Sequence, residues 1–233
     1  MRGIYIVGNY PDKDSFTKCF DAVISAGYEF VEIGVPFSEP VADGPVIASA
    51  VQEALSSGVK AGDVLAGLKT LKKGDAKLYV MTYANIIYSY GIKQFSDDFK
   101  DVLSGLIIPD VPNMLHSYFY DQGFEIPVIP FVTPESREED IKKAAGLKGD
   151  FIYFIGIRGI TGGSVDLSSP EISDRVKQIK TFTDKKIVMG FGIKDKTDAD
   201  KALKVADGFV VGTAAVKLQK NTAEYTSFVN SLV

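Results

Sequence analysis

The sequence is poor in the residues that most often build metal sites and covalent cross-links. It contains one cysteine, Cys19, and one histidine, His116, in 233 residues. One cysteine cannot form an internal disulfide, and such a composition fits the reducing cytoplasm. With one residue of each kind, no metal cluster of the usual ligand types is visible. His116 falls on an expected outer helix, so we expect neither a metal site nor a catalytic histidine.

Long apolar runs and an excess of positive charge are also missing. No apolar run approaches the roughly 18 residues of a membrane helix, and the N-terminal residues lack the features of a signal peptide. The net charge is −4, so no basic surface favours nucleic acid. The glycine patterns of Rossmann and Walker A sites are absent, as is G-x-S-x-G. We therefore expect a cytoplasmic protein without nucleic-acid or membrane partners.

Short apolar runs recur along the whole chain, with amphipathic helical patterns between them. Their β-branched and aromatic residues and their short length favour strands over buried helices. Nearly continuous hydrophobicity is typical of parallel strands that are covered on both sides. The expected strands are 4–7, 29–34, 77–82, 105–108, 126–130, 151–155, 186–190 and 207–211.

The expected helices follow these strands in regular alternation. They cover 14–26, 46–56, 61–73, 93–103, 113–122, 136–145, 169–181, 196–204 and 221–232. Ser169, Pro170 and Glu171 supply an N-cap, a first-turn proline and a first-turn acid. Alternation of this kind predicts an α/β protein, a single-domain TIM (β/α)8 barrel over residues 1–233. A doubly wound open sheet is the alternative.

Residues 31–45, VEIGVPFSEPVADGP, carry two carboxylates in unlike settings. Glu32 lies inside an apolar strand, where a carboxylate is either buried at a cost or directed into a cavity for chemistry. Asp43 lies in the loop after that strand, and such loops cover the mouth of a barrel. This pairing predicts acid–base chemistry that is divided between the two residues.

The loops after the last strands indicate a phosphate site. Gly192 allows backbone N–H groups to approach an anion, and Gly212 and Thr213 lead into a short helical stretch whose N-terminus favours negative charge. Many barrels bind phosphate between the loops that follow strands seven and eight. Gly162 is a possible third contributor. The alternative is that these glycines are turn residues without a ligand.

For other polar residues near strand ends, the sequence allows both a functional and a purely structural role. Residues 156–168 form a long loop rich in Gly, Thr and Ser, which is either a lid or a mobile surface loop. Asp110 either caps the following helix or contacts a substrate or partner. Tyr83 and Asn85 either line the pocket or pack and satisfy loop backbone, and Tyr153 is either a pocket or a core residue.

Residues 31–45 closely resemble the signature of the tryptophan synthase alpha chain family. Similar segments are 81–85 (MTYAN), 109–112 (PDVP), 159–162 (GITG), 190–193 (GFGI) and 211–217 (VGTAAVK). The resemblance covers nearly the whole chain and implies retro-aldol cleavage of indole-3-glycerol phosphate to indole and glyceraldehyde 3-phosphate.

The resemblance also implies roles for single residues. Glu32 would donate a proton to the indole ring, and Asp43 would accept a hydrogen bond from the indole N–H. Thr161 would hold Asp43 when the lid closes, and Tyr153 would line the pocket. Phosphate and substrate would be bound by Gly162, Phe191, Gly192, Ile193, Gly212 and Thr213.

By the same resemblance, the chain has no cofactor of its own and docks on a beta chain that uses pyridoxal phosphate. An alpha–beta–beta–alpha heterotetramer is expected, with Asp110 and residues 42–45 near the interface. The sequence departs from the family in lacking an N-terminal helix, in the position of Arg158, and at Glu39 and Thr213. A free-standing lyase and a weakly catalytic activator of a beta chain are the alternative functions.

Overall fold

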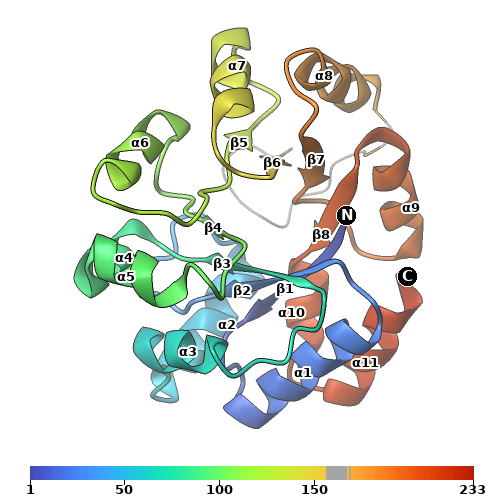
Figure 1. Ribbon diagram of the computed structural model, residues 1–233. Coiled ribbons are helices and arrows are strands. Elements are labelled where there is room, and N and C mark those ends of the chain that lie inside the picture. Colours follow the sequence, from blue (N-terminus) through green and yellow to red (C-terminus); the bar gives the residue numbers. More distant parts are fainter. Residues whose placement is uncertain (156–166, 168) are drawn as a thin grey trace.

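The strands of the protein form one parallel sheet that curls into a barrel, with the helices outside it (Figure 1). A computed structural model describes residues 1–155, 167 and 169–233. The order across the sheet is β4-β3-β2-β1-β8-β7-β6-β5. The strands are β1 (Arg2–Val7), β2 (Phe30–Gly34), β3 (Lys77–Met81), β4 (Gly105–Ile107), β5 (Phe131–Val132), β6 (Phe151–Phe154), β7 (Lys186–Met189) and β8 (Gly208–Val211).

The barrel closes between β4 and the segment that precedes β5. A strand was expected over residues 126–130 of this segment, and its bounds are wrong. An isolated parallel bridge joins Leu106 to Val128. The Leu106 N–H donates to the carbonyl of Pro127 at 2.8 Å, and the Ile129 N–H donates to the carbonyl of Leu106 at 2.8 Å. Pro127 and Pro130 have no N–H to donate, so the ladder is interrupted here and the regular strand is confined to Phe131–Val132.

The helices surround the strands, and several differ from the expected ranges. In the part of the chain that the structure describes, none is long and apolar enough to cross a membrane. The helices are α1 (Lys13–Ser25), α2 (Pro45–Ser56), α3 (Ala61–Leu68), α4 (Ala84–Tyr90), α5 (Ile92–Phe99), the 3-10 helix η1 (Asn113–Leu115), α6 (His116–Tyr120), α7 (Glu138–Gly146), α8 (Pro170–Lys180), α9 (Lys196–Val205), α10 (Thr213–Leu218) and α11 (Thr222–Ser231).

The expected helices differ from the structure at three places, each for a local reason. The third expected helix ends early because Thr70 donates both its N–H and its hydroxyl to the carbonyl of Gly67. Helix α4 was not predicted, and Gly91, with φ of +97°, separates it from α5. The helix expected over 113–122 is split at Leu115, whose φ of −100° and ψ of 0° interrupt the α conformation. The expected cap at Ser169 is confirmed.

Alternation along the strands separates two apolar layers. On β1, Ile4 and Ile6 pack against the helices, whereas Tyr5 and Val7 belong to the cluster inside the barrel. The same alternation on β2 turns Val31 and Ile33 outward, so the intervening residue points inward. A single polar residue at that inward position, Glu32, therefore stands among the apolar side chains of the barrel interior.

Three aromatic rings fill the barrel interior below this level. Phe30, Tyr79 and Phe151 meet with centroids between 5.2 and 5.9 Å apart. The Tyr79 hydroxyl donates to Asp150 at 2.8 Å, which satisfies its polar atom where the interior meets the lower rim. This closely packed layer belongs to the apolar core inside the barrel.

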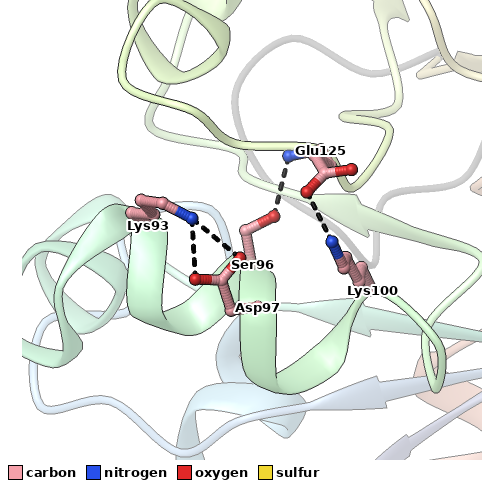
Figure 2. Close-up of polar contacts among 5 residues, drawn as sticks. All are labelled: Lys93, Ser96, Asp97, Lys100 and Glu125. Atoms are coloured by element: carbon pink, nitrogen blue, oxygen red, sulfur yellow. Dashed lines mark hydrogen bonds and ion pairs between the residues drawn. The ribbon is translucent and has the colours of Figure 1, made fainter.

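Helix α5 is fixed to the chain that leads into the fifth strand (Figure 2). The buried Ser96 hydroxyl accepts a hydrogen bond from the Glu125 N–H at 2.7 Å. Lys100 forms an ion pair with the Glu125 carboxylate at 2.6 Å, and Lys93 pairs with Asp97 one helical turn along. The hydrogen bond to Ser96 contributes more than the ion pairs, because exposed ion pairs add little to stability.

Candidate active site

A cavity of about 410 Å³ opens at the carboxyl ends of the strands. This is the end of a (β/α)8 barrel at which active sites are found. The structure brings eight of the residues singled out from the sequence to its wall. They are Glu32, Asp43, Tyr153, Phe191, Gly192, Ile193, Gly212 and Thr213.

Glu32 is buried in the wall of this cavity, with 1% of its surface exposed. The hydroxyl of Tyr153, on β6, donates a hydrogen bond to its carboxylate at 3.1 Å. Burial raises the pKa of Glu32 to about 8, and the negative charge of Asp43 adds to that effect, while the bond from Tyr153 opposes it. At neutral pH Glu32 is therefore mainly protonated and can act as an acid.

Asp43 is half-buried at the mouth of the same cavity. The hydroxyl of Tyr83 donates to its Oδ2 at 3.0 Å and accepts the Ala42 N–H at 3.2 Å. The ring of Phe37 stacks on Tyr83 with centroids 5.0 Å apart, which fixes the tyrosine beneath the loop. Burial raises the pKa of Asp43 to about 6, and the bond from Tyr83 limits the rise. Asp43 is therefore mainly ionised at neutral pH, whereas Glu32 keeps its proton.

The buried acid predicts a pH-dependent stability. Between the usual glutamate pKa of 4.5 and the folded value of about 8, the folded protein keeps a proton that the unfolded chain has released. The free energy of unfolding therefore falls as pH rises through this range. Because Glu32→Gln cannot ionise, we expect its stability relative to the wild type to rise between about pH 5 and about pH 8. Urea denaturation at both pH values measures this, and an unchanged difference would contradict a buried titrating acid.

The glycine-rich part of the cavity lies at β7 and β8. Gly192 has φ of +77°, a conformation that favours glycine, and a Cβ there would come 3.3 Å from Leu167. Gly212 is the N-cap of α10, and no side chain in the described ranges caps that helix end. Lys194 and Lys217 line the same part of the cavity and bring positive charge to it. The chemistry of this part suits an anion.

Three candidates do not line this cavity. Tyr83 is buried and contacts Asp43 from behind, whereas Asn85 is exposed on α4. Asp110 is exposed and accepts the Ala84 N–H at 3.1 Å, so it bonds the first residue of α4 rather than the helix that follows it in the chain. Thr161 and Gly162, with Arg158 and most of the expected lid, lie outside the described residues.

His116 lies on α6, fully buried and outside the residues that line the cavity. Burial lowers its pKa to about 4, so it is neutral at physiological pH.

The cavity also contains residues that were not predicted from the sequence, namely Tyr5, Lys194 and Lys217. An aromatic residue in an apolar strand looks like a core residue, so no local signal distinguishes Tyr5. Among the described residues, no group of three or more His, Cys, Asp or Glu could hold a metal ion.

The fold and the site define an enzyme on a (β/α)8 barrel, with a neutral acid and an ionised carboxylate at one cavity. Sequence comparison identifies the family. A family model described as tryptophan synthase alpha chain matches residues 4–232. The tryptophan synthase alpha chain of Thermotoga petrophila is 35% identical over 227 residues, which are 95% of this chain and 92% of that protein. The chain belongs to the tryptophan synthase alpha chain family.

Solved structures agree with this assignment. Tryptophan synthase subunit alpha from Campylobacter jejuni is 31% identical, with a TM-score of 0.87 over 100% of this chain and 95% of that one. A structure of Mycobacterium tuberculosis tryptophan synthase is 28% identical, with a TM-score of 0.89 over 99% of this chain and 90% of that one. Both support the eight-stranded barrel and, with it, the function of an alpha-chain lyase.

Proposed function

We propose that Glu32 and Asp43 carry out the cleavage of indole-3-glycerol phosphate to indole and glyceraldehyde 3-phosphate. The observation that carries this proposal is the pair of carboxylates at one cavity, one neutral and one ionised at neutral pH. Reactions that need an acid and an anion together require such a separation of pKa values.

In the proposed reaction, the bond between indole C3 and the first glycerol carbon breaks. Glu32 donates its proton to C3, which lets the bonding electron pair remain with the indole. The resulting carboxylate accepts the proton of the hydroxyl on the glycerol carbon, which becomes the aldehyde. Asp43 accepts a hydrogen bond from the indole N–H and stabilises the positive charge that develops on the protonated ring.

The phosphate group is proposed to bind at Gly192, Gly212 and Thr213, beside Lys194 and Lys217. Backbone N–H groups and lysines there would hold the anion and fix the distance between it and the two acids. Phe191 and Ile193 would cover the substrate from the same loop. Thr161 and Gly162 remain proposed contributors from the resemblance alone.

The phosphate site predicts a change mainly in substrate binding. A Cβ at Gly212 would lie at ordinary van der Waals distances of 3.7 Å from Ile47 and 3.9 Å from Tyr5, so the first side-chain carbon displaces no neighbour. We expect Gly212→Val to raise KM at least about 10-fold, equivalent to about 1.4 kcal/mol of binding energy, with a smaller change in kcat. Steady-state kinetics measures both constants. Gly62→Val, at a glycine with open space around it, is the control, and an unchanged KM in Gly212→Val would contradict the site.

A second surface is proposed to receive the beta chain. A groove of about 900 Å³ is lined by Ala42, Asp110 and Met114, among others. Met114 is 62% exposed, and the rings of Tyr88 and Tyr118, also exposed, meet at 6.2 Å. Exposed apolar groups that gather beside a site mark protein contacts. The proposed assembly is an alpha–beta–beta–alpha heterotetramer in the cytoplasm, with pyridoxal phosphate held only by the beta chain.

Product analysis tests the proposed reaction. The purified chain, incubated with indole-3-glycerol phosphate, is expected to release indole and glyceraldehyde 3-phosphate in equal amounts. Consumption of the substrate without indole would contradict the proposal. The relatives reported above are tryptophan synthase proteins, and they do not favour a free-standing lyase or a weakly catalytic activator.

A further inference from the structure

Tyr5 lines the candidate active site but has no part in the reaction as proposed above. It lies on β1, is 4% exposed, and faces the same cavity as Glu32 and Asp43. In the ladder between β1 and β2, Tyr5 is the register partner of Glu32. The two inward side chains therefore start at the same level of the barrel, one strand apart.

The tyrosine ring reaches from the level of Glu32 toward the mouth of the barrel. Gly34 is the next inward position on β2 after Glu32, and a Cβ there would lie 2.0 Å from the Tyr5 Oη and 2.6 Å from its Cζ. The hydroxyl thus occupies the space that a side chain at position 34 would need. Glycine at this position is what allows Tyr5 to reach the level above the acid.

The other end of Tyr5 lies beside the proposed phosphate site. A Cβ at Gly212 would lie 3.9 Å from the Cβ of Tyr5. Strand β1 stands between β2, which carries Glu32, and β8, which leads to Gly212. A substrate whose phosphate lies near Gly212 and whose ring lies near Asp43 therefore places its central glycerol segment next to Tyr5.

The Tyr5 hydroxyl is a protonated donor that is not committed to either acid. Burial first, and then the negative charges of Asp43 and Glu32, raise the pKa of Tyr5 well above its usual value, so it keeps its proton. Tyr153 donates to Glu32 and Tyr83 donates to Asp43. Within the described residues, neither carboxylate accepts a hydrogen bond from Tyr5.

We propose that Tyr5 is a further substrate-contacting residue, whose hydroxyl donates a hydrogen bond to a glycerol hydroxyl of the substrate. This inference rests on the proposed function, since it requires a substrate with hydroxyls between a ring and a phosphate. The contact holds the bond that breaks beside Glu32, and the site selects against chains that lack those hydroxyls.

Tyr5→Phe tests the contact because it removes only the hydroxyl and keeps the ring over Gly34. We expect kcat/KM for indole-3-glycerol phosphate to fall about 10-fold, the usual effect of one lost hydrogen bond in a closed site. The second ligand is an analogue in which indole is joined to phosphate by a propyl chain without those hydroxyls. We expect its inhibition constant to be the same in the wild type and in Tyr5→Phe, because it offers no partner to the Tyr5 hydroxyl.

Tyr225→Phe is the matched control. Its hydroxyl is buried on α11 without a hydrogen-bond partner in the described ranges, outside the cavity, so kcat/KM should stay at the wild-type value. A wild-type kcat/KM in Tyr5→Phe would overturn the inference. An equal loss of affinity for the substrate and the analogue would also overturn it, because that result indicates a distorted site. A wild-type protein that does not cleave the substrate would overturn the proposed function, and the inference with it.

Discussion

Glu32→Gln is expected to abolish the release of indole from indole-3-glycerol phosphate while the substrate still binds. Glutamine keeps the shape of the side chain and can still accept the hydrogen bond from Tyr153, but it cannot donate a proton to carbon C3. General acid catalysis alone accounts for about 100- to 10,000-fold in rate, and here the same group also accepts the second proton. We therefore expect a fall of at least about 1,000-fold in kcat.

Indole release and substrate affinity are measured together for this variant. Glu29→Gln is the control, because Glu29 precedes the same strand at the opposite end of the barrel and pairs with the N-terminal amine. Its turnover should match that of the wild type. Retained turnover in Glu32→Gln would exclude Glu32 as the acid, and lost binding would indicate that the side chain shapes the cavity rather than donating the proton.

Asp43→Asn is expected to impair cleavage severely but to leave a trace of activity. Asparagine can still accept the indole N–H, but it carries no charge to stabilise the protonated ring. Removing one such electrostatic contact costs on the order of 100-fold in kcat. The residual rate follows because Glu32 remains in place to donate the proton.

Tyr83→Phe gives a graded comparison with Asp43→Asn. It keeps the carboxylate but removes the hydroxyl that holds it at 3.0 Å, so the loss in kcat should be smaller than in Asp43→Asn. The same kinetic assay measures both variants. A wild-type rate in Asp43→Asn would show that the charge at this position is not used.

The barrel could be predicted from the sequence because its strands are short, apolar and separated by amphipathic helices. The direction of Glu32 was left open by the sequence, because the residues around it on β2 are apolar on both faces, and only the two layers of the structure show that it points inward. The prediction failed where local chemistry overrides the pattern. Pro127 and Pro130 interrupt the fifth strand, and the short helix α4 has a mixed composition that gave no periodic signal.

The candidate site was predictable only in part, because its shape depends on pairs of residues from neighbouring strands. Tyr153 reaches Glu32 because Gly190, across the ladder on the β7 side, lacks a Cβ that would lie 1.8 Å from the Tyr153 ring. Tyr5 passes over Gly34 in the same way. No pattern along one segment shows such a pair, so Tyr5 looked like an ordinary core residue.

The most direct test of the alpha-chain function is indole release from indole-3-glycerol phosphate by the purified chain, measured with and without an added tryptophan synthase beta chain. We expect slow release by the chain alone and a sharp rise when the beta chain is present, because the proposed docking groove includes Ala42, the neighbour of Asp43. No release under either condition would contradict this function.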